Sequence, residues 1–172
     1  SKRKMKDEIL FSSPYEYPDL SQETTETGRV YVAGEERLSS VTTILSKTKQ
    51  ENDSLQKWIE RVGEEEAERI RNEAAARGTE MHELLERQLV EGSIWDYYPE
   101  TADQKRAYKM ACTIMDQGFP SIDHVYGCEV SLYFPGGYAG TADVIGKHLG
   151  EDAIMDFKQT NIPKKSRRFV WD

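Results

Sequence analysis

The sequence predicts a mixed α+β fold of the α/β class, in which helices pack on a central sheet. Two observations carry this prediction. Apolar residues recur at helical spacing from about residue 53 to residue 117. Alternating strands, separated by glycine-containing turns, then follow between residues 124 and 157. In a chain of 172 residues, 37% of them hydrophobic, this order favours one mixed sheet with helices against it.

The charge balance excludes nucleic-acid binding by bulk attraction. There are 31 acidic residues against 23 Lys and Arg, which gives a formal net charge of −8. Any such binding therefore needs a local basic patch, or metal ions that neutralise carboxylates. We see no signal peptide and no membrane span, and expect a cytoplasmic protein. Cys112 and Cys128 are too few for a Cys-rich metal site, and two free thiols are favoured over one disulfide.

The first part of the chain is polar. We predict an extended or poorly ordered arm over residues 1–28, and a single domain over residues 29–172. Within that domain, we predict a hairpin of Arg29–Ala33 and Glu36–Leu38 around Gly34. Ser39 or Ser40 then caps a short helix over Val41–Lys47.

Three further helices are predicted in the middle of the chain. Asp53 or Ser54 caps the first of them. A long helix follows over Glu64–Leu89, interrupted by Gly78 at a point where another group approaches closely or the helix kinks. Thr101 and Gln104 form a capping box for the last helix, over Ala102–Gln117.

The predicted strands are His124–Phe134, Tyr138–Gly146 and Ala153–Phe157, the last two joined by a polar turn over Lys147–Asp152. Charged residues interrupt the apolar parts of the last two strands, at Asp143 and Asp156. A buried carboxylate is costly unless it is paired or binds a metal.

These two carboxylates predict a site for Mg²⁺ or Mn²⁺, which prefer oxygen ligands. The carbonyl of Phe157 could supply a further oxygen, and Lys158 would serve the same reaction centre by stabilising charge on a phosphate. The alternative is a surface salt bridge between Asp156 and Lys158, with Asp143 solvated.

Two more residues are candidates for the same site. In the helix, Gly78 would let a neighbouring group approach His82, whose imidazole would be a third ligand, and Arg77 would contact a phosphate. The alternative for His82 is a helix residue paired with Glu86. Glu129, in the preceding strand, is either an auxiliary acid or an ordinary solvent-facing residue.

Other positions are candidates for contacts with a nucleic-acid backbone. Ser40 and Thr42 stand at a helix start, where a phosphate can bind, although simple capping explains them as well. A basic cluster near the end of the chain would bind phosphates directly. It comprises Lys164, Lys165, Arg167 and Arg168.

Taken in order, several of these motifs resemble the RecB-type branch of the PD-(D/E)XK nuclease superfamily. The motifs are Arg77-Gly78 with His82, then Glu129, then Gly140 to Asp143, then Asp156-Phe157-Lys158. Together with the opening Ser40 to Leu45, they are similar to the mitochondrial genome-maintenance exonuclease and related phage exonucleases. The resemblance covers the chain from about residue 29 to its end.

The resemblance implies a restriction-endonuclease-like core holding Mg²⁺ or Mn²⁺. By it, His82, Asp143 and Asp156 are ligands, Lys158 is the catalytic lysine and Glu129 is an auxiliary acid. It also implies exonucleolytic cleavage of single-stranded DNA threaded under an arch of N-terminal helices. A monomer that acts in DNA repair or recombination, phage-encoded and working inside the host cell, fits that reading.

The sequence also departs from the family pattern. Ala142 stands where the superfamily has Pro before its first Asp. The Gln-x-x-x-Tyr helix of the family is missing, so we expect a domain truncated at its C-terminal end. A non-catalytic module that binds single strands, and an RNA nuclease, remain alternatives.

Overall fold

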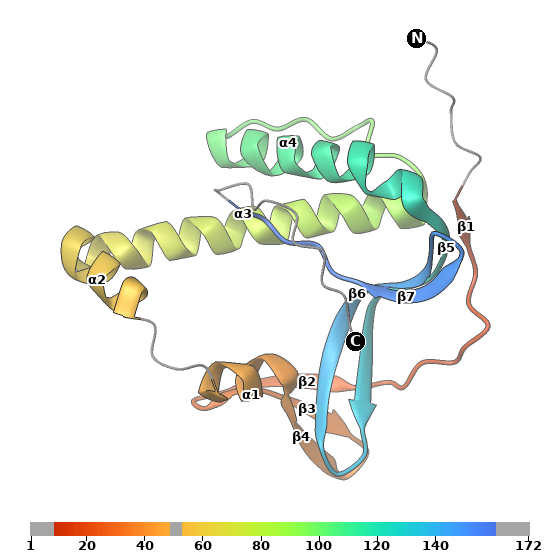
Figure 1. Ribbon diagram of the computed structural model, residues 1–172, viewed down its shortest axis with the longest axis horizontal. Coiled ribbons are helices and arrows are strands. Elements are labelled where there is room, and N and C mark those ends of the chain that lie inside the picture. The colour runs from red at the N-terminus through yellow and green to blue at the C-terminus, as the bar shows by residue number, and fades with distance from the viewer. Residues whose placement is uncertain (1–8, 49–52, 161–172) are drawn as a thin grey trace, which may run out of the picture.

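The computed structural model describes residues 9–48 and 53–160, and it has the predicted mixed α/β architecture. A seven-stranded mixed sheet is accompanied by four α-helices in these residues (Figure 1). The elements, in chain order, are β1 (Leu10–Phe11), β2 (Ser21–Thr25), β3 (Gly28–Ala33), β4 (Glu36–Ser40), α1 (Val41–Thr48), α2 (Asp53–Val62), α3 (Glu64–Glu91), α4 (Ala102–Gln117), a 3₁₀ turn (Phe119–Ser121), β5 (Ile122–Phe134), β6 (Tyr138–His148) and β7 (Glu151–Met155).

A long hairpin of β5 and β6 organises the sheet. Its strand order is β1-β5-β6-β4-β3-β2, and β7 also pairs with β6. Strands β1 and β4 run parallel to their partners β5 and β6, and the other pairs are antiparallel. In Figure 1 the hairpin passes from beside α3 and α4 down to strands β3 and β4 of the same sheet.

Two strands share one edge of β6. Strand β4 pairs with Tyr138 and Ala139, whereas β7 pairs with β6 from Val144 to His148. Residues 140–143 of β6 therefore face a gap, because no strand of the described chain pairs with them along that edge. Asp143 is the last residue of this gap.

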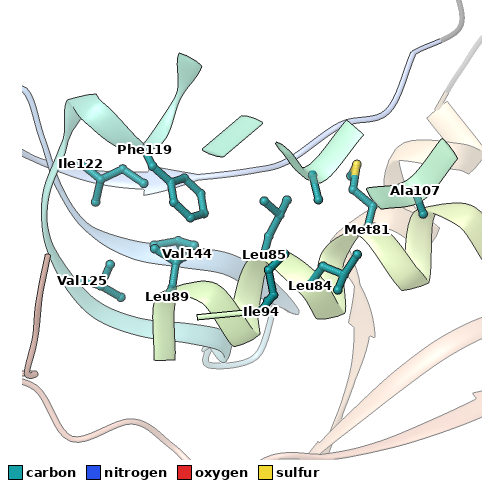
Figure 2. Packing of buried hydrophobic residues seen from close by; sticks show 11 residues of the cluster. Met81, Leu84, Leu85, Leu89, Ile94, Ala107, Phe119, Ile122, Val125 and Val144 are labelled. Atoms are coloured by element: carbon teal, nitrogen blue, oxygen red, sulfur yellow. The ribbon is translucent and has the colours of Figure 1, made fainter. Parts of the chain in front are cut away.

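The main hydrophobic core lies between the helices and the hairpin. Figure 2 shows side chains of α3 and α4 packed against Phe119 and against residues of β5 and β6. The buried members of this core are Met81, Leu84, Leu85, Leu89, Ile94, Ala107, Ala111, Phe119, Ile122, Val125 and Val144. A second, smaller cluster of Tyr31, Leu38 and Ala139 holds β3 and β4 against β6. The packing of α3 on the hairpin positions His82 next to β6.

Local sequence signals explain the helix ends. The Thr101 hydroxyl accepts from the Gln104 backbone N–H, and the Gln104 side chain accepts in return, which confirms the capping box. The Ser40 hydroxyl accepts from the Thr43 backbone N–H at 3.1 Å and caps α1. Helix α3 ends at Gly92, whose φ of 77° is a left-handed conformation that glycine adopts without strain.

The N-terminal segment differs from the predicted arm. It is extended, as expected, but β1 pairs with β5, and β2 pairs with β3. The predicted boundary at residue 28 therefore divides a hairpin of the sheet. Short or polar strands such as Ser21–Thr25 join a sheet through backbone hydrogen bonds, and they carry no alternating apolar pattern.

The remaining expectations concern one turn, the two cysteines, membrane-spanning helices and the helical arch. The last predicted turn is shorter than expected, because β6 extends to His148 and β7 begins at Glu151. The two cysteines are free, and burial, reinforced by nearby acids, raises the pKa of Cys128 to about 12. Among the described helices, none combines the length and the apolarity needed to cross a membrane. The helical arch stays a prediction, since residues 49–52 between α1 and α2 lie outside the described ranges.

Candidate metal centre

Asp143 is the centre of the candidate site. Its side chain is 13% exposed, and its Oδ2 accepts a hydrogen bond from the Phe157 backbone N–H at 2.7 Å. This bond ties the segment that follows β7 to the gap in the edge of β6. The Asp143 carboxylate is therefore held in place by the backbone and is not solvated.

Helix α3 places His82 against this carboxylate. The Nδ1 atom of His82 lies 3.5 Å from Oδ1 of Asp143, and the imidazole is 30% exposed. The His82 ring meets the Phe157 ring edge-on, with 6.3 Å between centroids, and Phe157 in turn packs on Phe119. Aromatic packing thus orients the imidazole beside Asp143.

Glu129 completes a group of three side chains of types that can bind a metal ion. Suitable ligand atoms of His82, Glu129 and Asp143 all lie within 4.8 Å of one another. Glu129 has a φ of 50°, a left-handed conformation that is rare for a non-glycine residue inside a strand. Strain of this kind is concentrated at functional sites. The sequence argument left Glu129 either an auxiliary acid or a solvent-facing residue; the structure leaves it exposed and also brings it into the converging group.

Asp156 and Lys158 lie beside this group. Strand β7 ends at Met155, so both follow the strand, whereas we had predicted a strand to Phe157. Nζ of Lys158 is 2.9 Å from Oδ2 of Asp156, with side chains 82% and 53% exposed. The Asp156 carboxyl also acts electrostatically on that of Asp143. The predicted alternative of a surface salt bridge is thus half met, because the pair exists but Asp143 is not solvated.

The crowding of carboxyl groups changes their pKa values. Burial raises the pKa of Asp143, and the neighbouring Asp156 carboxyl adds to the rise. The Phe157 N–H and His82 lower this pKa but do not cancel the rise. Burial, then the charges of Asp143 and Glu86, raises the pKa of Glu129. Burial also acts to raise the pKa of Asp156, but Lys158 and Asp143 outweigh it and hold that pKa below its usual value. The raised pKa values of Asp143 and Glu129 are those of partly buried acids whose charge is not fully balanced nearby.

Sequence reasoning missed one member of the environment. Glu86 lies one helical turn after His82 on α3, is half-buried, and acts electrostatically on Glu129 and Cys128. We had considered Glu86 only as a partner that would make His82 structural. Its spacing from His82 was the available signal that it faces the same group.

For Phe157, the recorded contact with Asp143 is made through the backbone N–H, whereas we had assigned the carbonyl to a metal. Arg77 forms an ion pair with Asp103 of α4, with 3.1 Å between Nη1 and Oδ1, and its side chain is only 11% exposed. The structure therefore places Arg77 in a link between α3 and α4.

The other predicted phosphate contacts are not brought to this group. Ser40 is buried, and its hydroxyl bonds to the hydroxyls of Thr42 and Thr43 at 2.9 Å, so capping accounts for it. Thr42 is exposed at the start of α1. The predicted basic cluster, Lys164, Lys165, Arg167 and Arg168, lies outside the described residues.

Gly78 marks the close approach that the sequence predicted. Nε2 of Gln159 donates to the backbone oxygen of Ala74 at 2.6 Å, and a Cβ on Gly78 would lie 2.8 Å from that nitrogen. The glycine therefore lets Gln159 attach the segment of Asp156 and Lys158 to α3.

We expect Gln159→Ala to lower activity at this centre several-fold while thermal stability changes little, because only the attachment to α3 is lost. Gly78→Ala should have the same effect on activity, since the added methyl displaces the amide. Alanine is favoured over glycine within a helix by about 1 kcal/mol, so Gly78→Ala should not unfold the protein. A double variant that is additive in activity would contradict this shared cause.

In comparisons with known proteins, no family model and no curated protein matches this chain.

Proposed function

We propose that this protein is a divalent-metal-dependent nuclease that hydrolyses phosphodiester bonds. One observation carries the proposal, namely that ligand atoms of His82, Glu129 and Asp143 lie within 4.8 Å of one another. They come from α3 and from the two strands of the β5–β6 hairpin, which lies much later in the chain. Asp156 and Lys158 stand next to them, which adds a carboxylate and an ammonium to the same centre.

The donor set fits a divalent cation. One imidazole nitrogen and carboxylate oxygens are ligands that Mn²⁺ accepts, and Mg²⁺ prefers the oxygens. The raised pKa values of Asp143 and Glu129 also fit, because a bound cation would offset both the burial of these charges and their mutual repulsion. His82, Glu129 and Asp143 would hold the ion, with Asp156 beside them, and the ion would supply Lewis-acid polarisation of the phosphodiester.

The residues of the chain would act around that ion in separate ways. The Phe157 N–H and the ring of Phe157 fix Asp143 and His82 before substrate binds. The Lys158 ammonium is largely exposed yet held by Asp156, so it can reach a phosphate and stabilise the negative charge that develops on it. Asp156 would thus position Lys158 as well as adding charge for the cation.

The substrate assignment within this proposal is single-stranded DNA, cut exonucleolytically by a monomer. It rests on the resemblance of the site motifs to RecB-type nucleases. The test is degradation of an end-labelled single-stranded DNA oligonucleotide in Mg²⁺, in Mn²⁺ and in EDTA, beside an RNA of the same sequence. We expect cleavage of the DNA in either ion, faster in Mn²⁺ because of the imidazole ligand, and none in EDTA.

Two results would contradict the proposal. Absence of cleavage in any divalent ion, with binding of the DNA that persists in EDTA, would assign a non-catalytic binding module. Faster cleavage of the RNA would assign a ribonuclease at the same centre.

A further inference from the structure

A groove of about 530 Å³ lies along the gap in the edge of β6. Residues 140–142 of β6 line it, between Val41 and Thr42 of α1 on one side and Ile154 of β7 on the other. The next residue of β6 is Asp143. The stretch of β6 that lines the groove is therefore continuous with Asp143 of the candidate metal centre, and the volume of the groove is that of a small-molecule site.

The walls of the groove are apolar and aromatic. Tyr133, Phe134 and Tyr138, at the end of the β5–β6 hairpin, line it together with Ile154. The rings of Phe134 and Tyr138 stack with centroids 5.8 Å apart and an angle of 21° between planes. These two rings are 62% and 48% exposed, and Ile154 is 68% exposed. An exposed apolar patch of this kind marks a binding site.

Among the described residues that line the groove, one is charged, and it is a cation. Arg29 of β3 is exposed, and no carboxylate in the described part of the chain lies within ion-pairing distance of it. Its guanidinium also interacts electrostatically with the Glu129 carboxylate of the candidate metal centre. Aromatic faces beside a free guanidinium, next to a cation site, match a ligand that carries both a flat ring and a phosphate.

We propose that this groove binds an unstacked base of single-stranded DNA, with Arg29 on the phosphate of that nucleotide. The adjoining phosphodiester would then lie at Asp143, where the floor of the groove ends. A base paired within a duplex cannot enter, so the groove selects single strands. The choice of DNA as occupant rests on the proposed nuclease function.

The test measures binding in EDTA, where no cleavage occurs. Anisotropy of a fluorescently labelled oligo(dT) should report affinities about 10-fold weaker or more for Phe134→Ala and Tyr138→Ala, the loss expected from removing a base–aromatic stack. Arg29→Gln should weaken binding and reduce the salt dependence by about one phosphate contact. Trp95→Ala and Tyr98→Ala, which remove aromatics that are 87% and 81% exposed between α3 and α4, are the matched controls and should bind as wild type.

Several outcomes overturn this inference. Folded groove variants that bind oligo(dT) with wild-type affinity would overturn it. A loss of affinity in Trp95→Ala as large as that in the groove variants would overturn it as well. Tighter binding of an RNA of equivalent sequence would exclude DNA as the occupant. A dimer in light scattering that dissociates in Phe134→Ala would make the groove a contact between two copies. Thermal denaturation of each variant separates these results from unfolding.

The inference and the proposed function fail separately. If wild-type protein binds oligo(dT) through the groove but cleaves nothing in Mn²⁺, the groove inference stands and the nuclease proposal is refuted. If groove variants cleave DNA in Mn²⁺ and bind oligo(dT) with wild-type affinity, the nuclease proposal stands and the groove inference is refuted.

Discussion

Asp143→Asn is expected to abolish metal-dependent cleavage and to lower Mn²⁺ affinity by about 100-fold or more, because it removes the central ligand charge. The asparagine oxygen can still accept from the Phe157 N–H, so the fold should be retained. In EDTA the same variant should be more stable than wild type by about 1 kcal/mol, since an unfavourable charge is gone. Calorimetric titration with Mn²⁺ and thermal denaturation measure the two effects.

The sign of the pH dependence follows from the raised pKa of Asp143 in the folded state. A raised acid pKa contributes stability below the unfolded-state pKa, and this contribution is lost as the pH rises through the folded-state pKa. In EDTA, wild-type stability should fall over that window, and Asp143→Asn should reduce the fall.

The control for this variant is Asp152→Asn, on β7. Asp152 accepts a hydrogen bond from the Tyr126 hydroxyl at 3.0 Å, away from the metal-ligand group, and asparagine keeps that acceptor. It should retain Mn²⁺ affinity and cleavage. An Asp143→Asn protein that binds Mn²⁺ as wild type does would show that Asp143 is no ligand. A variant that is destabilised in EDTA would contradict the unfavourable charge assigned to Asp143.

Lys158→Met should lower the rate of cleavage by about 10²–10³, the loss typical of removing one group that stabilises charge in the transition state. Methionine keeps much of the side-chain length without the charge. Because Lys158 is 82% exposed, stability should not change, and Mn²⁺ affinity should be retained since the ammonium is no ligand. Single-turnover cleavage of labelled DNA, with Mn²⁺ titration, measures both.

Lys105→Met, on the exposed surface of α4, removes the same charge at a distance and should cleave at the wild-type rate. Equal losses in the two variants would mean that Lys158 acts only through the net charge of the protein. Wild-type cleavage by Lys158→Met would refute its role in the reaction.

Much of the fold follows from local signals in the sequence. The Thr101 capping box, the periodicity of α3 and the alternation of β5 and β6 are properties of neighbouring residues, and their elements were predicted closely. The exceptions are β1, which pairs with the distant strand β5, and β2, a polar strand without an alternating apolar pattern that pairs with its neighbour β3. Pairing of this kind leaves little trace in an individual strand.

The candidate site was predictable in its residue types but not in its arrangement. The positions of Asp143 and His82 could be inferred from a buried acid and a helical glycine. The left-handed conformation of Glu129 could not be inferred, because glutamate has no local preference for it. The groove could not be predicted from the sequence either, because it forms where β4 and β7 share one edge of β6.

The most direct test of this account is a crystal of the protein soaked in Mn²⁺ and measured for anomalous scattering. The account predicts a peak within coordinating distance of the His82 imidazole and of the Glu129 and Asp143 carboxylates. A well-ordered site without a peak at saturating Mn²⁺, or with peaks only at other places, would contradict it.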